Sequence, residues 1–213
     1  MKHHQTKNKI VLSALIACSF LFVSCQSPKN PFPTESYVDL ESFMGTWYVV
    51  GYTPILVDGR AHNATEHYYL RPDGKIQTTY QYRNGSFDGP LKTFRPTGFV
   101  HNEETNAEWR MQFIWPFKAA YLIVHYDENL GETIIGHPNQ KYAWIMLREP
   151  KYEEATYERL LNKLVELGYD SALIKRLPQD WDNEALRLEM MKEAAPNAIN
   201  KKEWKKRSSS LSR

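Results

Sequence analysis

The stretch Gly45-Thr46-Trp47-Tyr48-Val49-Val50-Gly51-Tyr52 decides the fold, together with a later stretch, Tyr142-Ala143-Trp144-Ile145-Met146-Leu147-Arg148. Both are rich in alternating β-branched and aromatic residues, which is typical of strands whose two faces have different surroundings. Trp47 stands where a short helical turn, predicted over residues 39–44, leads into the first strand. Arg148 ends the last long strand, just before a predicted helix.

A contact between Trp47 and Arg148 would close one end of a barrel, because it would join the first strand to the last. A planar guanidinium over an indole face contributes roughly 0.5–2 kcal/mol as a cation–π contact. Taken singly, each residue is better explained as an ordinary core or rim residue. The interpretation depends on both residues, in this order and this far apart.

These features resemble the lipocalins, in particular the bacterial lipocalin lipoproteins of the outer membrane and their apolipoprotein D-like relatives. The resemblance covers roughly residues 37–181. Further matching stretches are Tyr68-Tyr69-Leu70-Arg71-Pro72-Asp73-Gly74, Gln112-Phe113-Ile114-Trp115-Pro116-Phe117 and residues 142–150. The resemblance implies an eight-stranded barrel that holds one small ligand.

Residues 1–24 have the features of a lipoprotein signal peptide. Three lysines and no acid precede an apolar run at residues 10–23, which is shorter than the roughly 20 residues that span a bilayer. The run ends in Phe22-Val23-Ser24-Cys25, which resembles a lipobox in which Cys25 becomes lipid-modified, although Phe22 replaces the usual Leu. Cleavage at Cys18, or a soluble secreted protein with an incidental cysteine, are the alternatives.

This processing leaves no thiol for a disulfide or a cysteine metal site. Of the 27 Lys+Arg residues three lie before Cys25, and none of the 25 Asp+Glu residues do, so the mature chain is close to neutral. That balance gives no support for a nucleic-acid partner. Residues 25–36 contain Pro28, Pro31 and Pro33 and are predicted to form an extended, lipidated tether.

From residue 39 onward the pattern predicts all-β structure for about 110 residues, with turn signals between strands and no intervening helix. This indicates an antiparallel up-and-down meander, and closing it into a barrel removes exposed edges. The predicted strands are residues 46–52, 65–70, 75–82, 91–100, 107–115, 120–126, 133–136 and 142–148.

The period changes to that of a helix over residues 153–167, where Tyr157, Leu160 and Leu164 share one apolar stripe. We therefore expect an appended C-terminal α-helix packed outside the barrel, followed by a short strand at residues 173–174. Residues 182–213 form a charged extension, predicted to be weakly helical to disordered. Its basic, Trp-bearing end is either solvated or settles on anionic lipid.

Alternation along the strands predicts which side chains face inward. Trp109, Met111, Phe113 and Trp115 alternate with the polar residues Arg110 and Gln112, so this apolar set should point in. If Arg148 points to the barrel end, Met146, Trp144 and Tyr142 share its side. The register that the resemblance implies adds Glu66, Tyr68, Thr78, Tyr80, Tyr82, Tyr121, Ile123 and His125 to the wall, with Trp47 and Val49 at the floor.

Such a lining is an apolar cavity with a few polar groups, which is the usual composition of a small-molecule site. Glu66 and His125 would hold a head group or water. A barrel filled by its own aromatic side chains is the alternative. The five histidines of the mature chain show no metal-ligand spacing, and no nucleophile motif or phosphate loop is present.

The sequence thus favours a non-enzymatic binder of a fatty acid, lysophospholipid or similar ligand, anchored in the outer membrane, without a cofactor, as a monomer or homodimer. Two rivals remain. A lipid- or isoprenoid-modifying enzyme would need Glu66 or His125 at a reactive ligand atom. A structural or adaptor envelope lipoprotein would have a filled barrel.

Overall fold

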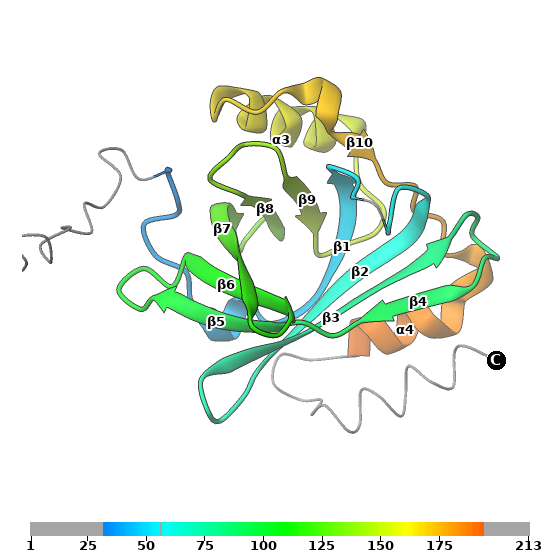
Figure 1. Cartoon of the computed structure of the whole chain (residues 1–213). Coiled ribbons are helices and arrows are strands. Elements are labelled where there is room, and N and C mark those ends of the chain that lie inside the picture. The colour runs from blue at the N-terminus through cyan, green and yellow to red at the C-terminus, as the bar shows by residue number, and fades with distance from the viewer. Residues whose placement is uncertain (1–31, 56, 194–213) are drawn as a thin grey trace, which may run out of the picture. The chain divides into compact units, whose positions relative to one another are not determined.

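The computed structural model describes residues 32–193 except residue 56 (Figure 1). The chain divides into two units, Met1–Phe32 and Pro33–Arg213, and the description below concerns the second. The signal-peptide prediction, Cys25 and most of the predicted tether lie outside the described residues, as does the C-terminal extension beyond residue 193.

The central element is a closed antiparallel β-barrel, as the sequence predicts. The strands follow one another in the order β1-β2-β3-β5-β6-β7-β8-β9, and β9 pairs with β1 to close the ring. β4 pairs with β3 beside β5, and β10 pairs with the other end of β1. The strands are β1 Gly45–Tyr52, β2 Ala61–Leu70, β3 Lys75–Asn84, β4 Leu91–Phe94, β5 Thr97–Asn102, β6 Glu108–Ile114, β7 Phe117–Asp127, β8 Glu132–Gly136, β9 Ala143–Leu147 and β10 Lys175–Arg176.

The fourth barrel strand is interrupted. The sequence predicts one strand over residues 91–100, whereas the structure has β4 and β5 with Arg95 and Pro96 between them. Both halves pair with β3, so together they occupy one of the eight places in the barrel. Proline has no N–H to contribute to a ladder, which is the physical reason for the break.

One end of the barrel is closed by the short helix α2, Leu40–Phe43. Asp39 caps this helix by accepting hydrogen bonds from the backbone N–H groups of Glu41 and Ser42 at 2.8 and 3.0 Å. The helix ends directly before β1, so that Phe43 is delivered into the barrel, where it is fully buried.

Arg148 and Trp47 meet at this closed end. The guanidinium carbon lies 3.7 Å from the centre of the indole ring. Arg148 also donates hydrogen bonds to the carbonyl oxygens of Thr46 at 2.9 Å and Ser42 at 2.7 Å, and Trp47 Nε1 donates to Phe43 O at 2.9 Å. Burial lowers the pKa of Arg148 to about 10. One cation thus ties the last strand to the first strand and to the helix.

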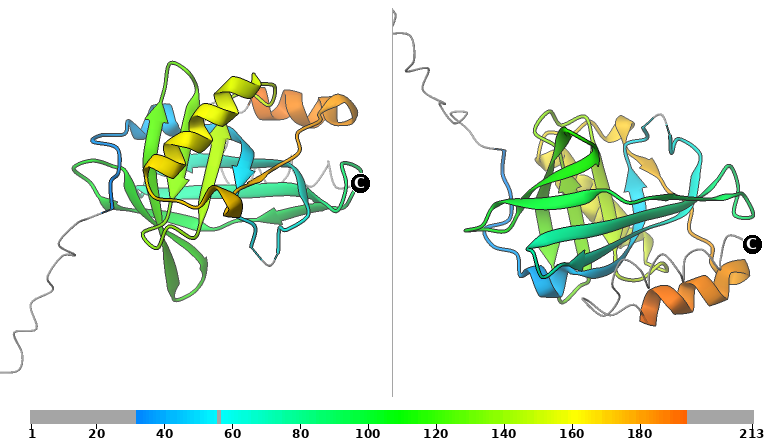
Figure 2. Two further views of the ribbon diagram at one scale, coloured as in Figure 1. Left: turned by 90° about the horizontal axis from the view of Figure 1, so that it is seen from above. Right: turned by 60° about the horizontal axis from the view of Figure 1, so that its bottom comes forward.

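Two helices flank the outside of the barrel (Figure 2). The first, α3 (Glu154–Glu166), buries Tyr157, Leu160 and Leu164, as the periodicity predicts. It approaches β1 closely at Gly51, where an added Cβ would lie 3.0 Å from Tyr157 Cε2. The short strand that follows is β10, two residues later than predicted, because residues 171–173 form a 3-10 turn.

The second flanking helix is α4, Ala185–Glu193, which is preceded by a 3-10 turn at Asp182–Glu184. Its Met191 packs with Tyr48 of β1 and with Trp181. Arg187 is 1% exposed; it donates hydrogen bonds to both oxygens of Glu184 and to Asn63 O of β2. This part of the predicted extension is therefore a docked element of the domain.

Candidate functional site

The half of the barrel next to α2 is filled by aromatic side chains. Phe43 contacts Trp109 edge to face, with ring centres 5.3 Å apart, and Tyr68 contacts Trp109 at 5.8 Å. Trp47 and Trp109 are both fully buried. Rings in such tilted arrangements pack densely, so this half forms a solid floor.

Above this floor the barrel is hollow. A cavity of about 530 Å³ lies at the end opposite α2. The lining is mostly aromatic and aliphatic, with a small set of carboxyl, hydroxyl and basic side chains. It consists of Ile55, Val57, Asp58, Glu66, Thr78, Tyr80, Phe94, Arg95, Pro96, Met111, Phe113, Ile114, Ala119, Ala120, Tyr121, His137, Tyr142 and Trp144.

Eight of the residues placed on the inner wall by sequence line this cavity. They are Glu66, Thr78, Tyr80, Met111, Phe113, Tyr121, Tyr142 and Trp144. They come from β2, β3, β6, β7, β9 and the loop before β9. Alternation and the register that the resemblance implies therefore identified side chains that meet from across the barrel. Trp144 reaches the site beside Tyr121, with the two rings stacked at 6.5 Å.

Five further predicted residues lie in the hydrophobic core but outside the cavity lining: Tyr68, Tyr82, Trp109, Ile123 and Met146. Trp109 belongs to the floor, where Tyr121 stacks on it at 5.5 Å. Tyr82 is covered by the loop after β1, since its hydroxyl donates to Val57 O. The expectation that Trp109 and Trp144 share one cavity is thus corrected, because Tyr121 lies against both rings.

His125 is not on the inner wall. The ladder between β7 and β8 shifts register between Ile123 and His125, and this bulge turns His125 outward. There its Nε2 lies 3.2 Å from Glu132 Oε1, and Nδ1 lies 3.5 Å from Glu35. Glu132 in turn accepts two hydrogen bonds from Arg159 of α3. Glu132 therefore joins His125 of the barrel wall to the helix outside it.

The rim of the cavity is apolar and exposed. At the β6–β7 hairpin Phe113 is 59% exposed, Ile114 73% and Trp115 81%. Trp115 was expected to point into the barrel, but the hairpin turns before the strand pattern reaches it. Phe117, which opens β7, is 75% exposed. Together these side chains extend the apolar lining out to the surface.

Several lining residues could not be assigned by strand alternation because they lie in loops or in the strand break. Ile55, Val57 and Asp58 come from the loop after β1, and Arg95 and Pro96 from the β4–β5 break. For Arg95 and Pro96, the only sequence signal is the proline itself, which marks an interruption in a strand.

Glu66 is a buried carboxyl group of the lining. It stands opposite Tyr80 in the β2–β3 ladder and neighbours Trp47 in the β1–β2 ladder. Tyr68 and Tyr121 direct their hydroxyls to one carboxyl oxygen, Oε2, and also contact each other. Burial raises the pKa of Glu66 to about 8, so the carboxyl group is mostly protonated at pH 7.

A second carboxyl group, that of Asp58, lies in the same lining. Its Oδ1 accepts the Ile55 N–H at 2.8 Å, and its Oδ2 accepts the Tyr80 hydroxyl at 3.1 Å. Burial also raises the pKa of Asp58. Two carboxyl groups, with Tyr80 beside both, therefore face a largely aromatic cavity.

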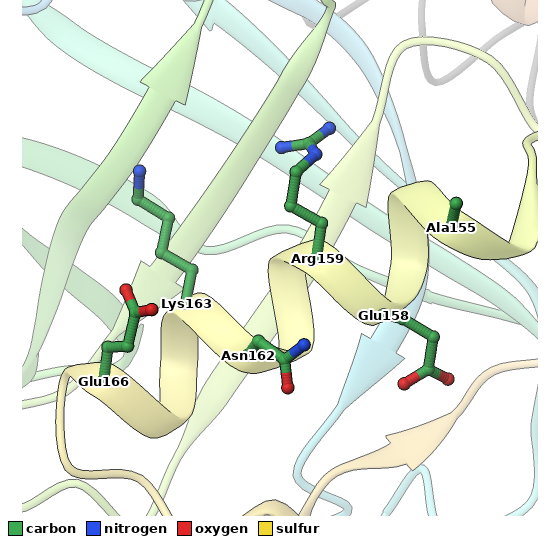
Figure 3. Close-up of a pocket in the computed structure, with 6 residues that line it drawn as sticks. All are labelled: Ala155, Glu158, Arg159, Asn162, Lys163 and Glu166. Atoms are coloured by element: carbon green, nitrogen blue, oxygen red, sulfur yellow. The ribbon is translucent and has the colours of Figure 1, made fainter.

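A second depression lies on the outer face of α3 (Figure 3). It is bounded by side chains of that one helix: Ala155, Glu158, Arg159, Asn162, Lys163 and Glu166. Arg159 is engaged with Glu132. Within the described residues no group of three or more His, Cys, Asp or Glu side chains is placed to hold a metal ion.

The barrel, its closing Trp–Arg contact and its cavity define a lipocalin. The chain belongs to the family of the lipocalin-like domain, whose model matches residues 38–179. The described helix α4 lies beyond the matched residues.

Among curated proteins, the chain is 29% identical over 159 residues to temperature-induced lipocalin-1 of Arabidopsis thaliana, covering 67% of this chain and 80% of that protein. It is 25% identical over 158 residues to the outer membrane lipoprotein Blc of Vibrio cholerae, covering 74% and 92%. The resemblance to bacterial lipocalin lipoproteins is thereby confirmed.

Solved structures confirm the fold. Insecticyanin from the tobacco hornworm Manduca sexta superposes with a TM-score of 0.56 at 14% identity, covering 79% of this chain and 89% of that one. The cockroach allergen Per a 4 superposes with a TM-score of 0.53 at 20% identity, covering 71% and 95%.

Proposed function

We propose that this lipocalin binds a small hydrophobic ligand with an acyl or alkyl chain, such as a fatty acid or lysophospholipid, and stores or carries it. The observation that carries the proposal is the cavity of about 530 Å³, which is closed below by the aromatic floor and lined mainly by apolar side chains. Rigid aromatic walls bury a large area and lose little side-chain entropy on binding.

The free energy gained by burying an alkyl chain in this cavity is sufficient for binding. Burying a methylene group contributes about 0.8 kcal/mol, so roughly ten methylenes supply about 8 kcal/mol before the costs of association. That is the scale of micromolar binding. The exposed rim at Phe113, Ile114 and Phe117 offers further apolar surface to the part of a chain that extends out of the cavity.

Binding is favoured over the two rival functions by where the side chains lie. Glu66 faces the cavity and His125 lies outside it against Glu132, so the two do not form an acid–base pair at a bound ligand, and only Glu66 of the two could act on one. An adaptor with a filled barrel is disfavoured by the hollow upper half.

We further propose that Cys25 carries a lipid that anchors the protein in the outer membrane. The Vibrio cholerae relative is named an outer membrane lipoprotein, and the lipobox-like stretch precedes the predicted tether that leads to the barrel. Across residues 32–193, with the gap at 56, no helix is long and apolar enough to cross a membrane.

Native mass spectrometry of the mature protein purified from membranes tests the binding proposal. A co-purifying lipid that is released on unfolding, with unchanged mass, supports storage or transport. Turnover of that lipid by the purified protein would instead identify an enzyme. If the protein carries no lipid and takes up no alkyl ligand, the binding proposal is wrong and the adaptor function is favoured.

A further inference from the structure

The acidic and basic side chains of the cavity lie at different depths. Its two carboxyl groups are buried: Glu66 is 8% exposed at the floor and Asp58 is 1% exposed beside Tyr80. The basic residues of the lining lie further out, since Arg95 is exposed in the strand break and His137 is half-buried after β8. Among the described lining residues, a negatively charged head group therefore has no buried cation to meet.

A buried hydroxyl points to a ligand group at the same place. Thr78 is 1% exposed and lines the cavity, and its Oγ1 has no hydrogen-bond partner among the described residues. Thr78 stands opposite Tyr68, whose hydroxyl binds Glu66, so Thr78 and Glu66 are diagonal neighbours on one face of the sheet. A buried hydroxyl without a partner is costly, and a bound donor would satisfy it.

The surrounding rings suit a positive charge. Tyr80 and Phe94 lie with their ring centres 6.2 Å apart, and Tyr121 stacks on Trp144. All four rings line the cavity. Aromatic faces attract ammonium groups, more strongly where water is excluded. Carboxyl oxygens, a hydroxyl acceptor and aromatic faces together form a receptor for a cation that carries hydrogen-bond donors.

We propose that the cavity selects ligands with an alkyl chain and an amine head group, held head-first at Glu66 and Thr78 with the chain directed to the rim. This inference rests on the proposed function and specifies its ligand class. An alkyl carboxylate binds more weakly. Its head group must either stay near Arg95 at the mouth or place an additional negative charge beside the carboxyl groups of Glu66 and Asp58.

Binding of an ammonium group is coupled to a proton. The groups that face Glu66 are Tyr68 on its own strand, Tyr80 on β3, Tyr121 on β7 and Asp58 in the loop after β1. None of them is a cation, which is why burial raises the pKa of Glu66 to about 8. The amine therefore displaces a proton from Glu66 to solvent below that pH, and its affinity rises with pH until Glu66 is ionised.

Dodecylamine, 1-dodecanol and dodecanoate, which share one chain length, test the inference on the mature protein. We expect dodecylamine to bind about ten- to a hundredfold more tightly than 1-dodecanol at pH 8, the scale of a charge-assisted hydrogen bond. Calorimetry in two buffers of different ionisation enthalpy should show proton release at pH 6.5 for the amine alone.

Glu66→Gln should remove the advantage of the amine over 1-dodecanol. Circular dichroism of the variant shows whether it is folded. Thr78→Val should weaken amine binding several-fold. Glu158→Gln, on the exposed face of α3, is the matched control and should change nothing.

The outcomes separate this inference from the function on which it rests. If 1-dodecanol and dodecanoate bind but dodecylamine binds no better than either, the amine assignment is overturned and lipid binding stands. The amine assignment is likewise overturned if Glu66→Gln keeps the full amine affinity. If none of the three ligands binds, both proposals fall.

Discussion

At the scale of single residues, the contact between Trp47 and Arg148 has the clearest energetic consequence. Trp47→Ala should lower the free energy of unfolding by about 3–5 kcal/mol, because a fully buried indole is lost. Arg148→Lys should also destabilise, since an ammonium group cannot stack on the ring and donate to Thr46 O and Ser42 O together. A double-mutant cycle by urea unfolding measures the coupling, and additive effects would contradict the contact.

The lining makes a second residue-level prediction. Trp144→Ala should weaken binding of a fluorescent alkyl ligand by about tenfold or more, because it removes one aromatic wall of the cavity. Arg110→Ala should leave binding unchanged, since Arg110 pairs with Glu108 and is not part of the lining. Titration followed by indole quenching compares the two. Equal loss in both variants would show that the wall is misassigned.

Glu66 should also make stability depend on pH. Its pKa is raised from 4.5 to about 8 in the folded state, so the folded protein binds more protons than the unfolded chain between these values. Stability contributed by Glu66 is therefore greatest below pH 4.5 and falls as the pH rises to 8. Glu66→Gln removes this dependence, and the variant should gain in stability over the wild type by several kcal/mol across that interval.

Thermal unfolding of both proteins at pH 4.5 and pH 8 tests this. If the difference in stability between the wild type and Glu66→Gln is the same at both pH values, the pKa of Glu66 is not raised by folding.

At the scale of whole elements, α4 is held by one buried cation. Arg187 bridges Glu184 and Asn63 O, and Glu184 also accepts from Arg83 of β3. Arg187→Ala should destabilise by roughly 3–5 kcal/mol, because it leaves a buried carboxylate without this partner. Lys192→Ala, which removes an exposed pair with Glu149, should cost under about 1 kcal/mol. Urea unfolding measures both, and similar values would contradict an anchoring role.

The elements also show what the sequence could predict. The register that the resemblance implies placed Glu66 and Tyr80 on the wall, and alternation from Arg148 placed Trp144 there; all three line the cavity because their strands are regular where these residues lie. It failed at His125, where one extra residue in β7 reverses the faces and leaves no mark in the composition. Asp58 was missed because a loop has no period, so its approach to Tyr80 depends on tertiary packing alone.

At the scale of the whole molecule, location should depend on one residue. Cys25→Ala should release the protein into the soluble envelope fraction, because stable anchoring needs two or more acyl chains and all would be attached there. Fractionation and immunoblotting of the two forms measure this, with Cys18→Ala as the matched control. Release by Cys18→Ala instead would move the cleavage site to that cysteine.

The way the ring closes has a consequence for the order of folding. The hydrogen bond from Arg148 to Thr46 O joins residues 102 positions apart, and β1 pairs with β9 over a similar distance. A chain synthesised only as far as β8 has two bare sheet edges, which are prone to pair with other chains. Because such distant contacts form slowly, closure by β9 should be a late step that ends this exposure. Whatever holds the nascent chain apart from its neighbours must therefore do so until almost the entire barrel has been made.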